Sequence, residues 1–405
     1  MIVSARTAPL ALALSLACSP AAFAHGDHDH GHDHDTPTAV RAFVADAIDG
    51  TVRAFDIESA EQIGTFTMDA PARLHRGATT GTIVASMPTG DAVAFIGTGV
   101  SLEDHGDHAD LVLEAPTLLP ARLTGGRPAH VNRDGSRIAV FFDDDGAAQL
   151  IGEAELTEAD VAVETISAGV PHHGLAKPVG GLLAISVPAE GERLPVAVSL
   201  LGAEGAPLVR AECARLHGEG QSGSVLAFGC ADAVAFVDTA ASPPRAWRHA
   251  YAAEPGGERM VRNIQGAVAF RSFLADFGPD GMVVVDPSAE DGFAFVQLPA
   301  RRMHFALDAD PGDTGWVVVE DGRLLKLNAL TGAILGEVAV TDRYTMEQGV
   351  VRPRISVAGG HVVVTDPAAG EIVVVDGATM AVERRIAVGG EPGDVVLVSA
   401  SGAAH

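Results

Sequence analysis

A run of eleven residues near the N-terminus carries the clearest chemistry in this sequence. From His25 to Asp35 the chain reads His-Gly-Asp-His-Asp-His-Gly-His-Asp-His-Asp, with five imidazoles and four carboxylates. Imidazole nitrogen binds zinc, copper, nickel and iron, and the carboxylates add anionic oxygen ligands. No hydrophobic residue interrupts the run, so we expect a disordered metal-binding tail over residues 25–38 rather than an accidental polar leader or a tag. The predicted tail ligands are His25, His28, His30, His32 and His34.

The residues before this tail have the pattern of a secretory signal. Arg6 precedes an apolar run from Ala8 to Ala17, and Ala22-Phe-Ala24 forms an A-x-A cleavage site. We therefore expect residues 1–24 to be a signal peptide and the chain to be exported to the periplasm. Lipid attachment at Cys18 is the alternative. No later segment approaches the roughly 18 apolar residues of a membrane span, so no membrane insertion is predicted.

Cleavage at this site leaves Cys213 and Cys230 as the remaining thiols. Two cysteines in an oxidising compartment favour one disulfide over a metal pair. The chain has no C-x-x-C pattern, which argues against a thiolate zinc site. We predict a Cys213–Cys230 disulfide.

The charge of the chain limits its partners. The formal net charge is −26 and the pI is about 4.8. Nucleic acids and anionic membranes bind basic faces, so neither is an expected partner. We expect a monomer.

Short strands recur along the chain from Val40 onward, and they predict the fold. Runs rich in Val, Ala, Ile and Phe alternate with Gly, Pro and Asp turns, and no long segment has a 3.6-residue apolar period. Four short strands per unit, repeated about every 45 residues, are typical of a β-propeller. We predict an all-β propeller over residues 39–400.

The phase of the repeat gives the number of blades. Eight inner-strand starts align, at steps of 40 to 55 residues, so we expect eight four-stranded blades; a misphased unit would leave seven. The last inner strand, at Asp394, has no strands after it. It can pair with the strand at Val40–Val44 and close the ring, which removes an exposed edge.

Histidines occupy the start of the inner strand in five of the eight units. Inner strands line the channel of a propeller, so these side chains should meet at one end of the channel. A single histidine at such a position would more often form structural hydrogen bonds than bind a metal. His249 and His361 fall outside this register and are expected to be structural. The histidines at the shared register are His75, His130, His172, His173, His217 and His304.

A second His-Gly-Asp-His sequence lies at His105 to His108, within a loop that is rich in acidic residues. We take the flanking runs, Ala92–Phe95 and Leu111–Glu114, as the second and third strands of a blade. A loop between those strands would overhang the same mouth, which makes His105 and His108 further candidate ligands; an exposed polar hairpin is the alternative. The equivalent loop of the next unit holds Asp143-Asp-Asp145, which carries little weight because Asp-Gly turns are common.

Three or four histidines with an aspartate suit tetrahedral zinc, and the absence of a Cys/Met-rich site disfavours copper(I). Neutral imidazole is required, so binding should weaken below about pH 6.5. We predict Zn²⁺ as the bound ion; copper(II) or nickel would also bind the tail. A mobile tail beside an ordered site suggests capture followed by transfer.

An exported acidic β-propeller that opens with an H-G-D-H-D-H tract resembles the AztD-type periplasmic zinc metallochaperones. The resemblance covers the architecture of the mature chain, and the His/Asp tract is its distinctive motif. It implies that the partner is the periplasmic solute-binding protein of a zinc ABC importer. It also implies an ordered His-rich zinc site. The ligands of that site are assigned here only from the alignment of histidines at the starts of the inner strands.

An enzyme is the main alternative, because propellers also host lactonases, quinoprotein dehydrogenases and phytase-like metal chemistry. A three-ligand zinc beside Glu219 could activate water and make this protein a metal-dependent hydrolase. The sequence has no G-x-S-x-G or H-E-x-x-H motif, and a hydrolase would have no use for the tail. A protein-interaction scaffold is the remaining possibility.

Overall fold

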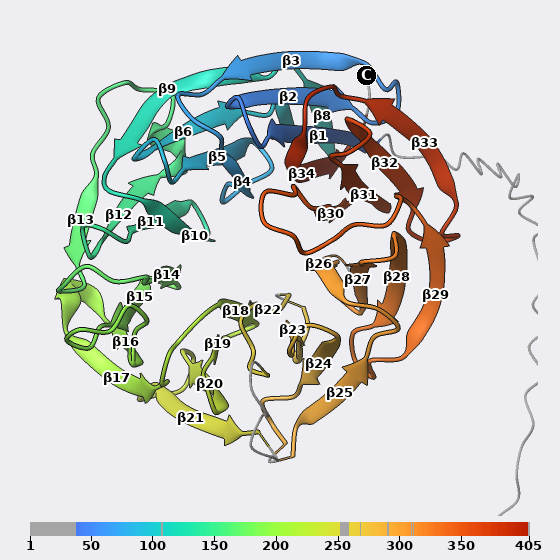
Figure 1. Ribbon diagram of the computed structural model, residues 1–405. Helices are drawn as coiled ribbons and strands as arrows, with labels where there is room; N and C mark the ends of the chain where they lie inside the picture. The colour runs from blue at the N-terminus through green and yellow to red at the C-terminus, as the bar shows by residue number, and fades with distance from the viewer. Residues whose placement is uncertain are drawn as a thin grey trace, which may run out of the picture. The chain divides into compact units, whose positions relative to one another are not determined.

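Eight four-stranded antiparallel sheets form the blades of a β-propeller in the computed structural model (Figure 1). The structure describes residues 38–403 except 107, 252–258, 268, 290, 309 and 311. The predicted fold is confirmed, with eight blades rather than seven. We number the blades 1 to 8 along the chain, starting with the sheet that contains β1.

The innermost strands line the channel and run in the same direction in every blade. In the order of blades 1 to 8 they are β34 (Pro392–Ser401), β4 (Arg73–Arg76), β10 (Pro128–Asp134), β14 (Ala176–Val179), β18 (Glu219–Ser222), β22 (Ile264–Gln265), β26 (Arg302–Leu307) and β30 (Ile355–Ala358).

The two middle strands of each blade are nearly continuous apolar runs, because neighbouring blades cover both of their faces. The second strands are β1 (Thr38–Asp46), β5 (Thr82–Met87), β11 (Arg137–Phe142), β15 (Leu182–Val187), β19 (Val225–Gly229), β23 (Phe273–Asp276), β27 (Thr314–Val319) and β31 (His361–Asp366). The third strands are β2 (Thr51–Asp56), β6 (Ala92–Gly97), β12 (Ala147–Gly152), β16 (Ala197–Leu201), β20 (Ala233–Asp238), β24 (Gly281–Val285), β28 (Arg323–Asn328) and β32 (Glu371–Asp376).

The outer strands lie on the rim in Figure 1, and most of their residues are exposed or half-buried. They are β3 (Gln62–Thr67), β9 (Thr117–Thr124), β13 (Glu164–Ser167), β17 (Pro207–Glu212), β21 (Arg245–Ala250), β25 (Phe293–Gln297), β29 (Ile334–Ala339) and β33 (Val382–Ala387). Two 3₁₀ turns, η1 (Glu153–Glu155) and η2 (Ala203–Gly205), and a separate hairpin of β7 (Val100–Asp104) and β8 (Ala109–Leu113) complete the described elements. The described residues include no helix long and apolar enough to cross a membrane.

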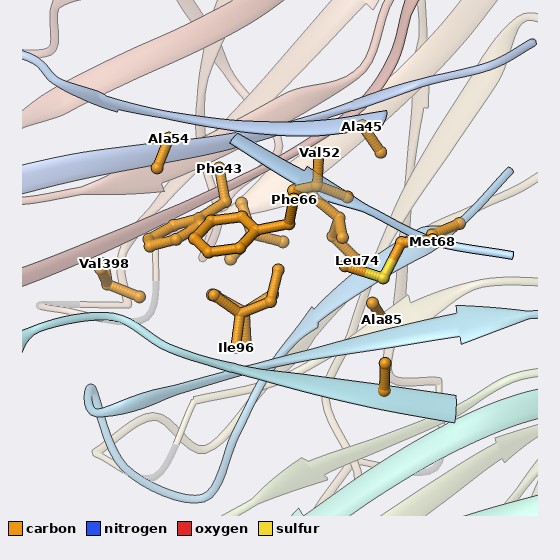
Figure 2. Packing of buried hydrophobic residues seen from close by; sticks show 14 of the residues in the cluster. Phe43, Ala45, Val52, Ala54, Phe66, Met68, Leu74, Ala85, Ile96 and Val398 are labelled. Atoms are coloured by element: carbon orange, nitrogen blue, oxygen red, sulfur yellow. The ribbon is translucent and has the colours of Figure 1, made fainter. Parts of the chain in front are cut away.

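The first and last strands close the ring, as predicted. β1 pairs with β34 in antiparallel register, with Val44 opposite Val395 and Val40 opposite Ser399. Blade 1 then packs on blade 2 through an apolar cluster in which Phe43 and Phe66 lie against Leu74 and Ile96 (Figure 2). Closure pairs β1 on both edges, with β2 on one side and β34 on the other, so the middle strand of blade 1 is covered like those of the other blades.

Candidate metal centre

Three histidines from three consecutive blades meet at one end of the channel, and we call them the three-histidine cluster. His130 lies in β10, His173 just before β14, and His217 just before β18. The ring centre of His173 is 4.9 Å from that of His130 and 5.3 Å from that of His217. The rings of His130 and His217 are 6.4 Å apart. The cluster lies at the end where the inner strands begin, as the register argument requires.

Each ring of the cluster is oriented through its Nδ1 atom. The acceptors are Glu219 Oε1 at 3.2 Å from His130, Asp143 Oδ2 at 2.7 Å from His173, and the Arg262 carbonyl oxygen at 2.9 Å from His217. A proton on each Nδ1 leaves the lone pair on each Nε2, which is the form that binds a metal. The Nε2 atoms of His130 and His173 face each other at 3.4 Å, where a cation would relieve the repulsion of their lone pairs.

These separations are close to those of a tetrahedral zinc site. A Zn–N distance near 2.0–2.1 Å sets ligand nitrogens about 3.3 Å apart and ring centres about 5 Å apart. The His173 pairs meet this condition, and the His130–His217 pair is wider. Within the described ranges, no three or more His, Cys, Asp or Glu side chains are already closed around a metal position. Metal binding therefore requires His217, which is partly exposed, to move toward His130.

The electrostatics of the cluster centre on Glu219. Burial lowers the pKa of His130, but attraction to Glu219 outweighs it and leaves the pKa raised. Burial raises the pKa of Glu219, yet His130 and Asn132, which donates to Oε1 at 2.7 Å, lower it to about 2. Burial lowers the pKa of His217. Glu219 is thus ionised, and it favours the doubly protonated form of His130. A metal at this site would replace the Nε2 proton of that form, while the Nδ1 proton would remain bonded to Glu219.

His172 lies next to the cluster in sequence and points away from it. Its Nε2 is 2.8 Å from Ser186 Oγ, and its Nδ1 is 2.8 Å from the Val170 carbonyl oxygen. The ring is buried and packs edge-on against Phe141, with 5.0 Å between the ring centres. Both nitrogens are occupied, so His172 positions the loop that carries His173.

His75 and His304 lie on inner strands, but the structure does not bring them to the cluster. His75 Nε2 is 3.2 Å from Ser86 Oγ, and burial, helped by Arg73, lowers the pKa of His75 to about 3. His304 Nδ1 accepts a hydrogen bond from the Ile355 amide at 3.1 Å, and burial lowers its pKa well below the usual value. Blade 7, which carries His304, lies across the ring from blade 3, which carries His130.

The predicted position of His105 and His108 is wrong. Ala92–Gly97 is the third strand of blade 2, not the second, and its partner in the sheet is β9. The β7–β8 hairpin is therefore inserted between the third and fourth strands, at the channel end opposite the three-histidine cluster. The 55-residue repeat at this point contains the insertion and caused the misassignment.

The hairpin brings two histidines and an aspartate together. His105 Nε2 is 3.1 Å from Asp110 Oδ2, and His108 Nε2 is 3.4 Å from Asp110 Oδ1. The two rings stack at 5.4 Å. The C-terminal segment holds the hairpin in place, because the Ala403 amide donates to the Ala109 carbonyl oxygen and the Leu111 amide donates to the Ala403 carbonyl oxygen.

The structure contains the predicted disulfide. Cys213 and Cys230 are joined with 5.0 Å between their Cα atoms, and they connect the segment after β17 to the segment after β19 in the next blade. The tail histidines, His25 to His34, and the signal sequence lie outside the described residues.

Sequence reasoning undervalued the groups that orient the rings. Asp143 lies in the turn after β11, which faces the cluster, and its position in the repeat was the available signal. The Arg262 carbonyl left no trace in the sequence, because a backbone acceptor is not encoded by residue type. The sequence suggests Glu219 as a base for water, but the structure places it on the Nδ1 side of His130, away from the metal-binding atom.

Comparison with known proteins decides the family. No protein-family model matches the chain. The zinc chaperone AztD of Citrobacter koseri is 33% identical over 373 residues, which cover 91% of this chain and 88% of that protein. The chain belongs to the AztD family.

Solved structures agree with this assignment. The crystal structure of C. koseri AztD matches with a TM-score of 0.85 at 33% identity, covering 91% of this chain and all of that one (100%). The apo form of C. koseri AztD matches at 0.83 and 32% identity, with the same coverage of the two chains (91% and 100%). The dihydro-heme d1 dehydrogenase NirN, at 12% identity and a TM-score of 0.58 over 88% of this chain and 74% of its own, shares the fold alone.

Proposed function

We propose that this protein is a periplasmic zinc metallochaperone that captures Zn²⁺ and transfers it to the solute-binding protein of a zinc ABC importer. The observation that carries the proposal is the three-histidine cluster, in which every Nδ1 has an acceptor and the Nε2 atoms are left for a metal. The C. koseri relative is named a zinc chaperone, which supports zinc as the ion. His130, His173 and His217 are the proposed ligands of the ordered site, and the fourth position is left for water or a ligand from the acceptor.

The hairpin is proposed as a second, weaker site. His105 and His108 direct their Nε2 atoms at one carboxylate, Asp110, and all three groups are partly exposed. Thr38 pairs with Ser401, and Ala403 bonds to the hairpin, so the first described residue lies on the hairpin side of blade 1.

Two observations weigh against a hydrolase. Glu219 accepts hydrogen bonds from His130 Nδ1 and from Asn132, and its low pKa makes it a poor proton acceptor. It also lies behind the ring, on the side away from Nε2. A zinc-bound water in the cluster would therefore have no base from Glu219, and the groups present suit binding and release.

The test is a chelator titration of the zinc-loaded mature protein. It compares the unchanged protein with a deletion of residues 25–35 and with the double variant His130→Ala/His217→Ala. We expect the deletion to keep one tight site and lose transfer to the solute-binding protein, and the double variant to lose the tight site. Tight binding that disappears with the tail alone would show that the cluster is structural. The variant His361→Ala is the control, because His361 lies on β31 in blade 8 and bonds to Glu383 rather than to the cluster.

A further inference from the structure

A small cavity lies beside the three-histidine cluster, between blades 6 and 7, which carry β22 and β26 (Figure 1). It has a volume of about 180 Å³, and its charged lining residues are Arg262, Arg301, Arg302 and Asp276. Arg262 joins the cavity to the cluster, because its carbonyl oxygen accepts a hydrogen bond from His217 Nδ1 at 2.9 Å. The cavity is therefore at the end of the channel where the inner strands begin, next to the proposed metal ligands.

The cavity is basic in a chain that has only 27 Lys and Arg against 53 Asp and Glu. Among the described residues that line it, Asp276 is the single acid, and its carboxylate is fully engaged. Oδ1 accepts from the backbone amides of Arg262 and Asn263 at 2.6 and 2.9 Å. Oδ2 accepts from the side chains of Asn263 and Arg302 at 2.8 and 3.1 Å. Asp276 thus balances the buried end of Arg302 and leaves two guanidiniums in excess.

Arg262 and Arg301 carry this excess charge. Both are exposed, and neither guanidinium forms a side-chain hydrogen bond or an ion pair with any residue that the structure describes. Glu320 lies close to Arg301 in the backbone, since its amide donates to the Arg301 carbonyl oxygen at 2.7 Å, but its carboxylate pairs with Arg343 at 2.9 Å. Each of the two guanidiniums keeps five donors, in a planar array that matches a carboxylate.

Methionines form much of the remaining wall, and the size of the cavity limits its ligand. Met260 is buried, Met303 is half-buried and Met346 is 37% exposed. Methionine is unbranched and polarizable, so surfaces rich in it adapt to protein partners. Pockets for cofactors and other small molecules usually measure about 300–1,000 Å³. A volume of about 180 Å³ therefore fits one or two side chains of a partner protein better than a cofactor.

We propose that this cavity docks an acidic side chain, Asp or Glu, from a loop of the protein that accepts the zinc. The inference rests on the transfer function proposed above and specifies the surface that the acceptor contacts. The carboxylate pairs with Arg262 and Arg301, and its aliphatic part packs against the methionines. Because the Arg262 backbone also holds His217, a loop bound here lies beside the cluster. Metal ligands on that loop then compete for zinc at a high local concentration.

The experiment measures the rate of zinc transfer from the loaded mature protein to the zinc-free solute-binding protein at increasing acceptor concentrations. In Arg301→Glu the acceptor concentration that gives half the maximal rate should rise about fivefold or more, because the variant repels the docking carboxylate. The maximal rate and the zinc affinity measured with a chelator should not change, since the Arg301 side chain forms no contact with the cluster. Arg301→Lys keeps the charge and should retain most of the docking. Raising sodium chloride from about 0.05 to 0.5 M should weaken docking of the unchanged protein more than docking of Arg301→Glu.

Arg271→Glu is the matched control, because it changes the net charge of the protein by the same amount. Arg271 is an exposed arginine of the same blade, in the turn between β22 and β23 at the opposite end of the channel. Its variant should need the same acceptor concentration as the unchanged protein. A value for Arg301→Glu within about twofold of the value for Arg271→Glu overturns the docking site and leaves the zinc function standing. Absence of zinc transfer from the unchanged protein overturns the proposed function, and the docking site with it.

Discussion

Replacing Glu219 by glutamine tests the logic of the three-histidine cluster. The carboxylate accepts from His130 Nδ1 at 3.2 Å and from Asn132 at 2.7 Å. A hydrogen bond to a charged group contributes about 1.5–3 kcal/mol. Because about 1.4 kcal/mol is a factor of ten in affinity, Glu219→Gln should weaken zinc binding about ten- to a hundredfold.

Because protons compete with zinc for His130, the loss of zinc affinity in Glu219→Gln should depend on pH. Glu219 raises the pKa of His130, so zinc has to displace a proton from the unchanged protein below that pKa. The glutamine variant lacks this cause, and its His130 loses the proton at lower pH. The affinity of the variant should therefore depend less on pH between about 6 and 8, and the ratio of the two affinities should be largest at pH 8, where neither protein carries the proton.

Chelator competition at pH 6, 7 and 8 measures both quantities, with circular dichroism to check the fold. Glu212→Gln is the matched control, because Glu212 is exposed on β17 and pairs only with Arg210 among the described residues. An affinity of Glu219→Gln within about twofold of the unchanged protein at pH 8 would refute the claim that the carboxylate orients His130 for metal binding.

Three further predictions concern other parts of the molecule. Removing the disulfide by Cys213→Ala/Cys230→Ala, which opens a loop of 17 residues, should lower the free energy of unfolding by about 3 kcal/mol in urea titrations; an unchanged midpoint would contradict this. His105→Ala/His108→Ala should remove a weak zinc equivalent while the tight one stays, as measured by equilibrium dialysis, and loss of the tight equivalent would reverse the order of the two sites. His75 has a folded-state pKa near 3, below the unfolded value of 6.5, so the unfolded state takes up its proton first and stability falls as the pH drops below 6.5. Between pH 7 and 5 the free energy of unfolding, measured in urea titrations, should fall by about 2 kcal/mol because of His75, and His75→Gln should reduce the fall by that amount. If the fall is the same in the variant, a group other than His75 is responsible for it.

The architecture was predictable because the repeated apolar runs correspond to the buried strands of the blades. Valine-rich runs such as Val362–Val364 are covered on both faces in a propeller, and the blade count and ring closure follow from their spacing. The long repeat that contains His105 shows the limit of this reasoning. An insertion keeps strand-like patterning of its own, and only pairing, here β6 with β9, shows which strand it follows.

The sequence predicts which histidines lie at the starts of the inner strands, but not the direction in which each side chain points. Adjacent residues point in different directions, so His172 bonds to Ser186 while His173 joins the cluster. The difference depends on the turn before β14, which the sequence does not define. His75 belongs to the same register and is instead held by Ser86 of its own blade, through a contact between strands that no local pattern predicts.

The pairing of β1 with β34 also determines when the molecule can become complete. Residues 38 and 401 are neighbours in the finished sheet, so blade 1 cannot form until β34 has been made. Until then β1 and its neighbours have an unpaired edge, and closing a loop of more than three hundred residues is entropically slow. A chain truncated before Pro392 would keep that edge permanently and would be recognisable to proteases as unfinished. Ring closure thus acts as a check on chain completeness, separate from any metal the protein carries.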